Sequence, residues 1–168
     1  TAVGHTCIFT GSVPSINGIV GNNWIDQFSG ADIYCTEDST VRSVGASSPE
    51  GQMSPRNLLV STITDELRIA TNFQSRVVGV SLKDRAAILP AGHTANAAFW
   101  LDDTSGKFIS STYYMSRLPD WAEKYNREKN IDWLIADGWN TLYPINTYTE
   151  SEPDNQPYEG KLSGEALP

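Results

Sequence analysis

The sequence predicts an α/β fold, because patterns typical of helices alternate along it with patterns typical of strands. The strongest helix pattern covers residues 55–71, and a run rich in β-branched residues follows it at 75–82. Later, two strand patterns at 97–102 and 108–114 flank Thr104-Ser105-Gly106, which is typical of a β-hairpin. The helix followed by a strand indicates a crossover unit of a layered sheet.

The first residues predict a short helix that begins after Thr1 and ends before Gly11. A threonine hydroxyl suits the position that caps a helix N-terminus, and glycine suits the position just beyond the last turn. A loop rich in turn-forming residues is expected at 12–18, and the stretch Gly21-Asn22-Asn23 comes after it.

The helix at 55–71 is expected to start with Ser54 as its cap and Pro55 in the first helical position. An apolar stripe should face the core, whereas Asp65 and Glu66 should lie on the wet face. The stripe consists of Leu58, Leu59, Ile63, Leu67, Ile69 and Ala70. The run at 75–82 then predicts a buried parallel strand.

Residues 119–129 predict a surface helix with Trp121, Ala122 and Tyr125 facing inward. The periodic pattern weakens after this helix, and residues 147–168 are polar and rich in turn formers. We therefore expect one domain part at 1–130 and the start of a loop-rich excursion or insertion at 131–168. The chain opens abruptly and ends without a closing element, so it is interpreted as a fragment.

The net charge of −8 and the pI near 4.6 argue against a nucleic-acid-binding surface, because clustered Lys and Arg hold phosphate backbones. A small phosphorylated substrate stays possible, since a few cations in one cleft outweigh a negative periphery at close range. The apolar runs are too short to span a bilayer. The two cysteines, Cys7 and Cys35, are either small buried side chains or a pair.

The most specific pattern in the chain lies at residues 1–24. A threonine precedes a short helix, and a Thr-Gly turn, a proline, a Gly-Ile pair and Asn22 follow. This block resembles the nucleophile block of nucleotide pyrophosphatase/phosphodiesterases and their phosphatase relatives in the alkaline phosphatase superfamily. The resemblance implies that Thr1 attacks phosphorus and that the Asn22 amide contacts the phosphoryl group.

The position of Thr1 supports this role on physical grounds. Unpaired N–H groups and the dipole at a helix N-terminus favour both an alkoxide and an anionic phosphate. The plain alternative is that Thr1 only caps the helix, which is the usual role of a threonine at this position. The surrounding block favours the nucleophile.

Lys83 and Arg85 follow the predicted strand, and α/β sheets place their sites at strand ends. On an extended backbone, residues two apart project the same way, so the two cations are expected to converge on one anion. Together with the threonine block, this Lys-x-Arg resembles the pair that distinguishes the phosphate-irrepressible periplasmic type of alkaline phosphatase. Two cations favour a monoester, which carries nearly two negative charges and three free oxygens, over a diester.

The resemblance covers nearly the whole chain and implies an alkaline phosphatase-like three-layer sandwich. Its central, mostly parallel sheet would be present here only in part, with residues 1–130 as the N-terminal part of the catalytic domain. Two Zn²⁺ are the implied cofactors, bridged by the Thr1 hydroxyl, with the other ligands outside this chain. The chain alone is therefore expected to bind zinc weakly and to hydrolyse nothing.

The implied activity is zinc-dependent hydrolysis of phosphate monoesters through a covalent phospho-threonine. The implied protein is a periplasmic or secreted monomer that acts on small phosphorylated substrates. His5 and His93 lack partners at metal spacing and are interpreted as structural hydrogen-bonding residues. Trp24 and Tyr34 lie near turns and are interpreted as packing residues rather than contacts of the leaving group.

Two rival functions stay open. A phosphodiesterase or nucleotide pyrophosphatase would share Thr1 and Asn22 but would not need Lys83 and Arg85. A metal-free, non-catalytic binding module would keep the fold and lack the metal ligands. The flanking reading frame separates this second rival, because an enzyme needs an upstream Asp and downstream Asp and His clusters.

Overall fold

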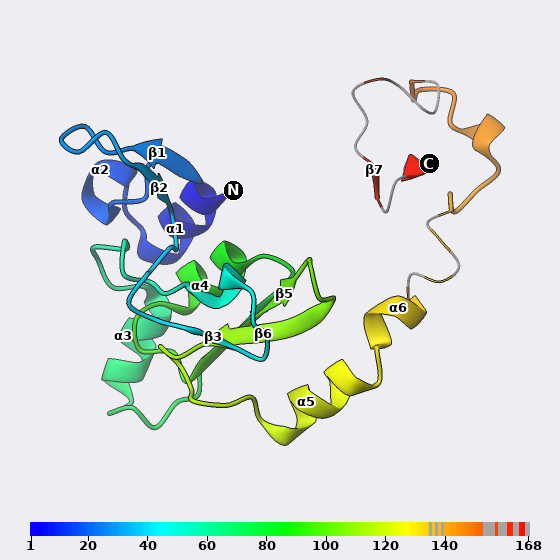
Figure 1. Cartoon of the computed structure of the whole chain (residues 1–168). Coiled ribbons are helices and arrows are strands. Elements are labelled where there is room, and N and C mark those ends of the chain that lie inside the picture. Colours follow the sequence, from blue (N-terminus) through cyan, green and yellow to red (C-terminus); the bar gives the residue numbers. More distant parts are fainter. Residues whose placement is uncertain are drawn as a thin grey trace. The chain divides into compact units, whose positions relative to one another are not determined.

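The structure is a computed structural model that describes residues 1–134, 136, 138, 140–152, 157, 161–162 and 165–166. The chain divides into two compact units, Thr1–Lys129 and Asn130–Pro168. The first unit contains the four-stranded sheet and the helices that pack on it (Figure 1).

The N-terminal elements of the first unit are two helices and a short hairpin. Helix α1 (Ala2–Thr10) begins after Thr1 and ends at Gly11, which has the left-handed φ of 62° that favours glycine. Both ends match the prediction. Helix α2 is Pro14–Asn17, and strand β1 (Asn23–Ile25) pairs antiparallel with β2 (Asp32–Tyr34).

The central sheet has the strand order β3-β6-β5-β4. Its strands are β3 (Ser43–Val44), β4 (Val78–Ser81), β5 (Ala97–Asp102) and β6 (Lys107–Ser111). Strands β5 and β6 form the predicted hairpin, whereas β4 and β5 are parallel and are joined by helix α4 (Asp84–Ala91). The part of the sheet present here is therefore mixed, because β3 also pairs antiparallel with β6.

Helices cover both faces of this sheet. Successive side chains of β5 point to opposite faces, so the contacts of neighbouring β5 residues show which helix lies on each face. On one face, Ala98 and Trp100 pack with Ala87 and Ile88 of α4. On the other face, Ala97 and Phe99 pack in a cluster that contains Ala122 of α5 (Asp120–Arg127). The described residues thus form helix, sheet and helix layers, which confirms the α/β prediction (Figure 1).

Helix α3 is shorter than predicted, because it begins eight residues after Pro55 and spans Ile63–Ala70. Ser54 does not cap it; its hydroxyl donates to Asp38 at 2.6 Å. The cap is Thr62, whose side chain accepts from the Asp65 amide while the Asp65 carboxylate accepts from the Thr62 amide. This reciprocal capping box fixes the start of the helix and explains the error.

The predicted faces of this helix are also wrong. Asp65 is 2% exposed rather than on the wet face, whereas Glu66 is exposed as expected. Leu58 is the one buried member of the predicted stripe, and the side chains of Leu59, Ile63, Leu67 and Ile69 are exposed. A hydrophobic side chain that faces away from the local core gives the same periodic signal as one that faces it.

Strand β4 is parallel to β5 as predicted, but it is not buried. Val78 and Val80 are 54% and 61% exposed. Within the described residues β4 pairs only with β5, so it is an edge strand of this unit. A β-branched run predicts a strand more reliably than it predicts what covers the strand.

Helix α5 confirms the prediction for residues 119–129, with one side chain placed differently. Ala122 is buried and Tyr125 is half-buried, whereas Trp121 is 60% exposed, although its ring makes a T-shaped contact with the ring of Phe99. Cys7 and Cys35 are both free thiols in the described structure, so the pairing alternative is not realised.

The described residues of the second unit form short elements. They are helix α6 (Asn130–Leu134), the 3-10 turn η2 (Ile145–Thr147), and strands β7 (Lys161–Leu162) and β8 (Glu165–Ala166), which pair antiparallel. No helix among the described residues of either unit has the length and apolar character needed to cross a membrane.

Candidate active site

The Thr1 hydroxyl is not used as a helix cap. Although Thr1 occupies the capping position of α1, its side chain makes no capping hydrogen bond within the described structure. Asn22 takes over this task, because its Oδ1 accepts from the Ala2 amide at 2.9 Å. The same Oδ1 lies 3.5 Å from the Thr1 hydroxyl. The helix end is thus satisfied from a distant segment, and the hydroxyl is left for another partner.

That partner is Arg85. Its Nε donates to Thr1 Oγ1 at 2.9 Å, across 84 positions of sequence. Arg85 lies in the first turn of α4, directly after β4 ends at Ser81. The structure therefore brings three of the four sequence-predicted residues together: Thr1, Asn22 and Arg85. A cation beside the hydroxyl favours its anionic form and any anion bound next to it.

Lys83 has a different partner. Its Nζ forms an ion pair with Asp103, and both side chains are substantially exposed. The expected extended geometry of residues 83–85 is wrong, because Lys83 caps α4 with extended φ and ψ while Arg85 is already helical. The two side chains therefore do not follow the simple alternation of a strand.

Arg85 is itself held by a side-chain network. Its Nη1 donates to the Tyr34 hydroxyl at 2.9 Å, and that hydroxyl donates to Asp84 Oδ1 at 2.9 Å. The second carboxylate oxygen of Asp84 accepts from the buried Thr36 hydroxyl. Burial of Tyr34, and then the charge of Asp84, raise the pKa of Tyr34, so its phenol keeps its proton.

The charge on Arg85 is secure. Partial burial would lower its pKa, but the hydrogen bond to Tyr34 and the charge of Asp84 outweigh this and raise the pKa. The N-terminus of α1 adds a partial positive charge at the same place. The site thus presents a hydroxyl between a helix N-terminus and a permanent cation, which suits an anionic, oxygen-rich group.

The described residues do not form a metal site by themselves. They contain no group of three or more His, Cys, Asp or Glu side chains placed to share an ion. Thr1 supplies one oxygen, and the carboxylate of the network is occupied by Tyr34 and Thr36. The His5 amide donates to the Thr1 carbonyl, and the His93 amide donates to the Asp65 carboxylate.

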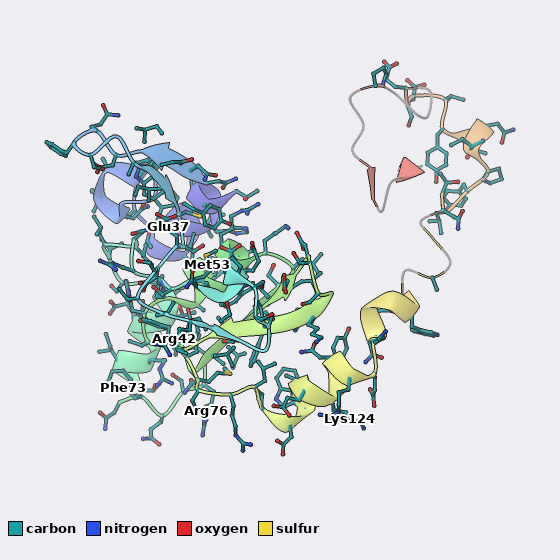
Figure 2. All side chains as sticks on the ribbon, in the orientation of Figure 1. Glu37, Arg42, Met53, Phe73, Arg76 and Lys124 are labelled. Carbon is teal, nitrogen blue, oxygen red and sulfur yellow. The ribbon has the colours of Figure 1, made fainter. Side chains whose placement is uncertain are left out.

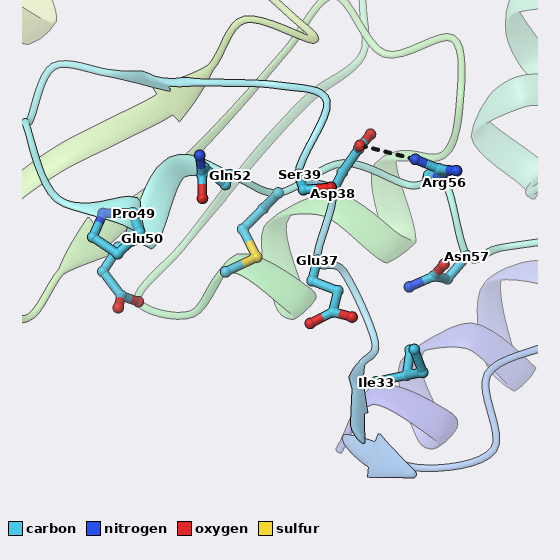
Figure 3. Close-up of a pocket in the computed structure, with 10 residues that line it drawn as sticks. Ile33, Glu37, Asp38, Ser39, Pro49, Glu50, Gln52, Arg56 and Asn57 are labelled. Carbon is cyan, nitrogen blue, oxygen red and sulfur yellow. Dashed lines mark hydrogen bonds and ion pairs between the residues drawn. The ribbon is translucent and has the colours of Figure 1, made fainter. Parts of the chain in front are cut away.

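Two hollows lie next to this network. The smaller one, of about 350 Å³, is lined in part by Tyr34, Lys83 and Arg85. The larger one, of about 600 Å³, contains the ion pair of Asp38 with Arg56 at 3.4 Å (Figure 3). Both are lined by Glu37 and Met53, which form an isolated antiparallel bridge and are labelled in Figure 2. Of the two hollows, the smaller one is lined by Lys83 and Arg85.

The sequence interpretation missed three residues of this site: Tyr34, Asp84 and Asp103. Tyr34 lies near a turn, where packing is the usual role of an aromatic residue, and nothing in its local sequence indicates that it meets Arg85, 51 positions away. Asp84 gave a usable signal, because an acid placed between Lys83 and Arg85 is suited to orient one of them. Asp103 follows β5, and its pairing with Lys83 depends on the parallel register of β4 and β5.

An α/β domain with a hydroxyl and a cation at the carboxyl end of a strand fits a class of proteins that act on anionic esters. The family model for type I phosphodiesterase / nucleotide pyrophosphatase matches residues 1–166. The chain belongs to this family.

Two similar relatives are named alkaline phosphatases. PhoV of Synechococcus elongatus is 60% identical over 164 residues, which cover 98% of this chain and 30% of PhoV. PafA of Elizabethkingia meningoseptica is 59% identical over 169 residues, which cover the whole of this chain and 31% of PafA. A Myroides odoratus protein named calcium-transporting ATPase is 56% identical, again with 31% of its length covered. The chain thus spans about 30% of the length of these relatives.

A solved structure agrees with these matches. The crystal structure of wild-type alkaline phosphatase PafA superimposes with a TM-score of 0.91 at 61% sequence identity. The match covers 96% of this chain and 31% of that one. The fold described above is therefore part of the alkaline phosphatase fold, as the sequence predicted.

Proposed function

We propose that the complete protein hydrolyses phosphate monoesters, with Thr1 as the nucleophile. One observation carries the proposal: the Thr1 hydroxyl does not cap helix α1, because Asn22 does, and it accepts a hydrogen bond from Arg85 at 2.9 Å instead. The Thr1 oxygen forms a bond to phosphorus while the bond to the ester oxygen breaks and the alcohol leaves. Water then attacks the phospho-threonine, which releases phosphate and restores the hydroxyl.

The charge of the transferring group assigns the other roles. Arg85 contacts the nucleophile, and Lys83 lines the same hollow as Arg85. Their two positive charges match a monoester dianion better than a diester monoanion. Lys83 would exchange its exposed partner Asp103 for the phosphoryl oxygens, since such surface ion pairs are weak. Asn22 keeps its Oδ1 on the helix amide, so its Nδ2 is the end that donates to the substrate.

A PafA variant supports this set of residues. One solved PafA structure carries four substitutions, at a threonine, an asparagine, a lysine and an arginine, in this order and 21, 62 and 2 positions apart. In this chain Thr1, Asn22, Lys83 and Arg85 follow the same order at intervals of 21, 61 and 2 positions. The agreement in residue type and spacing supports the proposal that these four residues belong to one site.

We propose two Zn²⁺ as the cofactors of the complete protein, with the Thr1 hydroxyl as the one ligand present here. Bound zinc would lower the pKa of this hydroxyl and polarise the phosphoryl oxygens. We further propose that residues 1–130 belong to the catalytic domain and that 131–168 begin an insertion. We also propose that the complete protein is a periplasmic or secreted monomer that acts on small phosphorylated substrates; the relatives' names support the phosphatase activity.

The test of the monoesterase assignment is a comparison of two substrates in the complete protein. Lys83→Ala and Arg85→Ala should each lower kcat/KM for an aryl phosphate monoester at least about tenfold more than for the matching diester. Equal losses on both substrates would support the phosphodiesterase alternative, which the family description also names. Full monoester activity in both variants would contradict the proposal.

A second experiment addresses the chain by itself. Since Thr1 is the one proposed zinc ligand that it contains, the 168-residue chain should show no zinc-dependent hydrolysis of a monoester. Activity of the isolated chain with added Zn²⁺ would show that it contains zinc ligands other than Thr1.

A further inference from the structure

Arg85 makes two directed contacts that together fix the plane of its guanidinium. Its Nε donates to Thr1 Oγ1 and its Nη1 donates to the Tyr34 hydroxyl, each at 2.9 Å. A guanidinium is planar and its donors form a rigid fork, so two contacts at different nitrogens leave it little freedom. The position of the cation beside Thr1 thus depends on the position of the Tyr34 hydroxyl.

We propose that Tyr34 and Asp84 are positioning residues that hold the Arg85 guanidinium against the Thr1 hydroxyl. This inference rests on the function proposed above, in which Arg85 binds the transferring phosphoryl group. Neither residue touches the substrate in this scheme. Each acts through Arg85. A chain of side-chain hydrogen bonds connects, in this order, Thr36, Asp84, Tyr34, Arg85 and Thr1.

The Tyr34 hydroxyl is suited to this task because it both accepts and donates. It accepts from Arg85 and donates its own proton to Asp84 Oδ1 at 2.9 Å. A hydrogen bond to a carboxylate polarises the hydroxyl and strengthens the bond that it accepts from the cation. Tyr34 ends strand β2, and the main-chain pairing of Asn23 with Tyr34 connects it to the segment of Asn22.

Asp84 anchors the far end of the network. Its side chain is 8% exposed, and its two oxygens accept from two different hydroxyls, those of Tyr34 and Thr36. Thr36 is fully buried, so its hydroxyl is fixed by the packing around it. Asp84 also lies in the first turn of α4, where the helix dipole favours a negative charge. The carboxylate is therefore a rigid acceptor, directly before Arg85 in the chain.

The experiment is a double-mutant cycle on the complete protein with an aryl phosphate monoester as substrate. Tyr34→Phe removes one oxygen and keeps the ring, so it should lower kcat/KM about tenfold when Arg85 is present. In the Arg85→Ala background the same substitution should change kcat/KM less than about twofold, because it then has no cation to position. Tyr34→Phe should likewise raise the inhibition constant of inorganic phosphate when Arg85 is present and change it little in the Arg85→Ala background.

A control tyrosine is available in Tyr113. Its hydroxyl donates a hydrogen bond to the His93 carbonyl at 2.9 Å, in a place outside the site. Tyr113→Phe should leave kcat/KM within about twofold of the parent protein. Asp84→Asn keeps one acceptor oxygen and should lose less activity than Asp84→Ala, which provides a second test if Tyr34→Phe perturbs folding.

The outcomes separate the two proposals. An equal loss on Tyr34→Phe in both backgrounds overturns the positioning role, even if Arg85→Ala is itself impaired. Wild-type monoester activity of Arg85→Ala overturns the function proposed for Arg85 and the positioning role with it. A loss confined to the background that contains Arg85 supports both.

Discussion

Asn22 caps helix α1 in place of Thr1, through a hydrogen bond of 2.9 Å from the Ala2 amide to Asn22 Oδ1. One amide would thereby perform two tasks, since its oxygen completes the helix end and, in the function proposed above, its nitrogen donates to the substrate. The two tasks can be separated by substitution, because a carboxylate reproduces the oxygen but not the nitrogen.

Two variants of Asn22 should therefore differ. Asn22→Asp keeps the cap, so its melting temperature should stay near that of the parent, but a negative charge beside the phosphoryl group should abolish most monoester hydrolysis. Asn22→Ala should cost about 1 kcal/mol of stability and a smaller part of the activity. Thermal unfolding and kcat/KM provide both readouts. An aspartate variant as active as the alanine variant would remove the donor role.

The ion pair of Lys83 with Asp103 should matter little to catalysis. The two side chains are 49% and 66% exposed, and solvent-exposed pairs contribute between about 0 and 1 kcal/mol. Asp103→Asn should change kcat/KM for a monoester by less than about threefold. A loss comparable to that of Lys83→Ala would instead mean that Asp103 sets the position of Lys83.

Asp65 should be a major contributor to stability. Its carboxylate accepts from the amides and hydroxyls of Thr62 and Thr94 and from the His93 amide, so it connects α3 to the loop after α4. Burial alone would raise its pKa, but these hydrogen bonds outweigh burial and lower the pKa below its usual value. Asp65→Asn should lower the free energy of unfolding by about 2–3 kcal/mol at neutral pH.

The same carboxylate sets a pH dependence. A folded-state pKa below the unfolded one gives stability that is complete above the unfolded pKa and is lost as pH falls through the folded pKa. The difference between the parent and Asp65→Asn in urea unfolding should therefore be constant above about pH 5 and shrink below about pH 4. Glu66→Gln is the control, because this neighbouring side chain is exposed and should change stability by less than about 0.5 kcal/mol. A constant difference down to pH 2 would contradict the assignment.

The two thiols should differ in reactivity. Cys35 is fully buried, and burial followed by the charge of Asp84 raises its pKa to about 11. Since the thiolate is the nucleophile, only about one molecule in a thousand is reactive at pH 8. Iodoacetamide should label Cys7 in the native protein and reach Cys35 only after unfolding, as measured by mass spectrometry. Rapid native labelling of Cys35 would show that this region opens.

Gly79 should tolerate no side chain. A Cβ at this position of β4 would lie 2.0 Å from the Ala87 carbonyl oxygen of α4, the helix that carries Arg85. Gly79→Ala should lower the free energy of unfolding by about 3 kcal/mol or more, or move α4 and lower activity.

In contrast, Gly4 is exposed within α1 and a Cβ there would meet nothing within 4 Å. Gly4→Ala should stabilise the protein by about 0.5–1 kcal/mol, measured by thermal unfolding.

Local sequence signals predicted the elements whose limits are set locally. The end of α1 at Gly11 and the hairpin around Gly106 follow from glycine conformations that few other residues adopt. The start of α3 was missed although the Thr62-x-x-Asp65 pattern was visible, because Ser54-Pro55 gave a competing signal of the same kind. The exposed side chains of Ile63 and Leu67 could not be predicted, since periodicity does not tell what covers a face.

The site was predictable to the extent that a known block carries it. Thr1, Asn22 and Arg85 lie together in the structure, and the resemblance does not indicate the Tyr34 hydroxyl that contacts Arg85. Tyr34 and Asp84 meet because β2 and the start of α4 approach each other in space, 50 positions apart. Such a contact depends on tertiary packing and leaves no local pattern.

The separation of Thr1 from Arg85 also bears on the order in which the protein is made. Strand β4, helix α4 and the β5–β6 hairpin are contiguous and close short loops, while the contact to Thr1 spans 84 positions. On the ribosome, the block at residues 1–24 is synthesised long before Arg85, whose guanidinium contacts the Thr1 hydroxyl. The Thr1 hydroxyl therefore has no cation beside it during much of translation. The contact between Thr1 and Arg85 forms only after the sheet that carries α4 has folded.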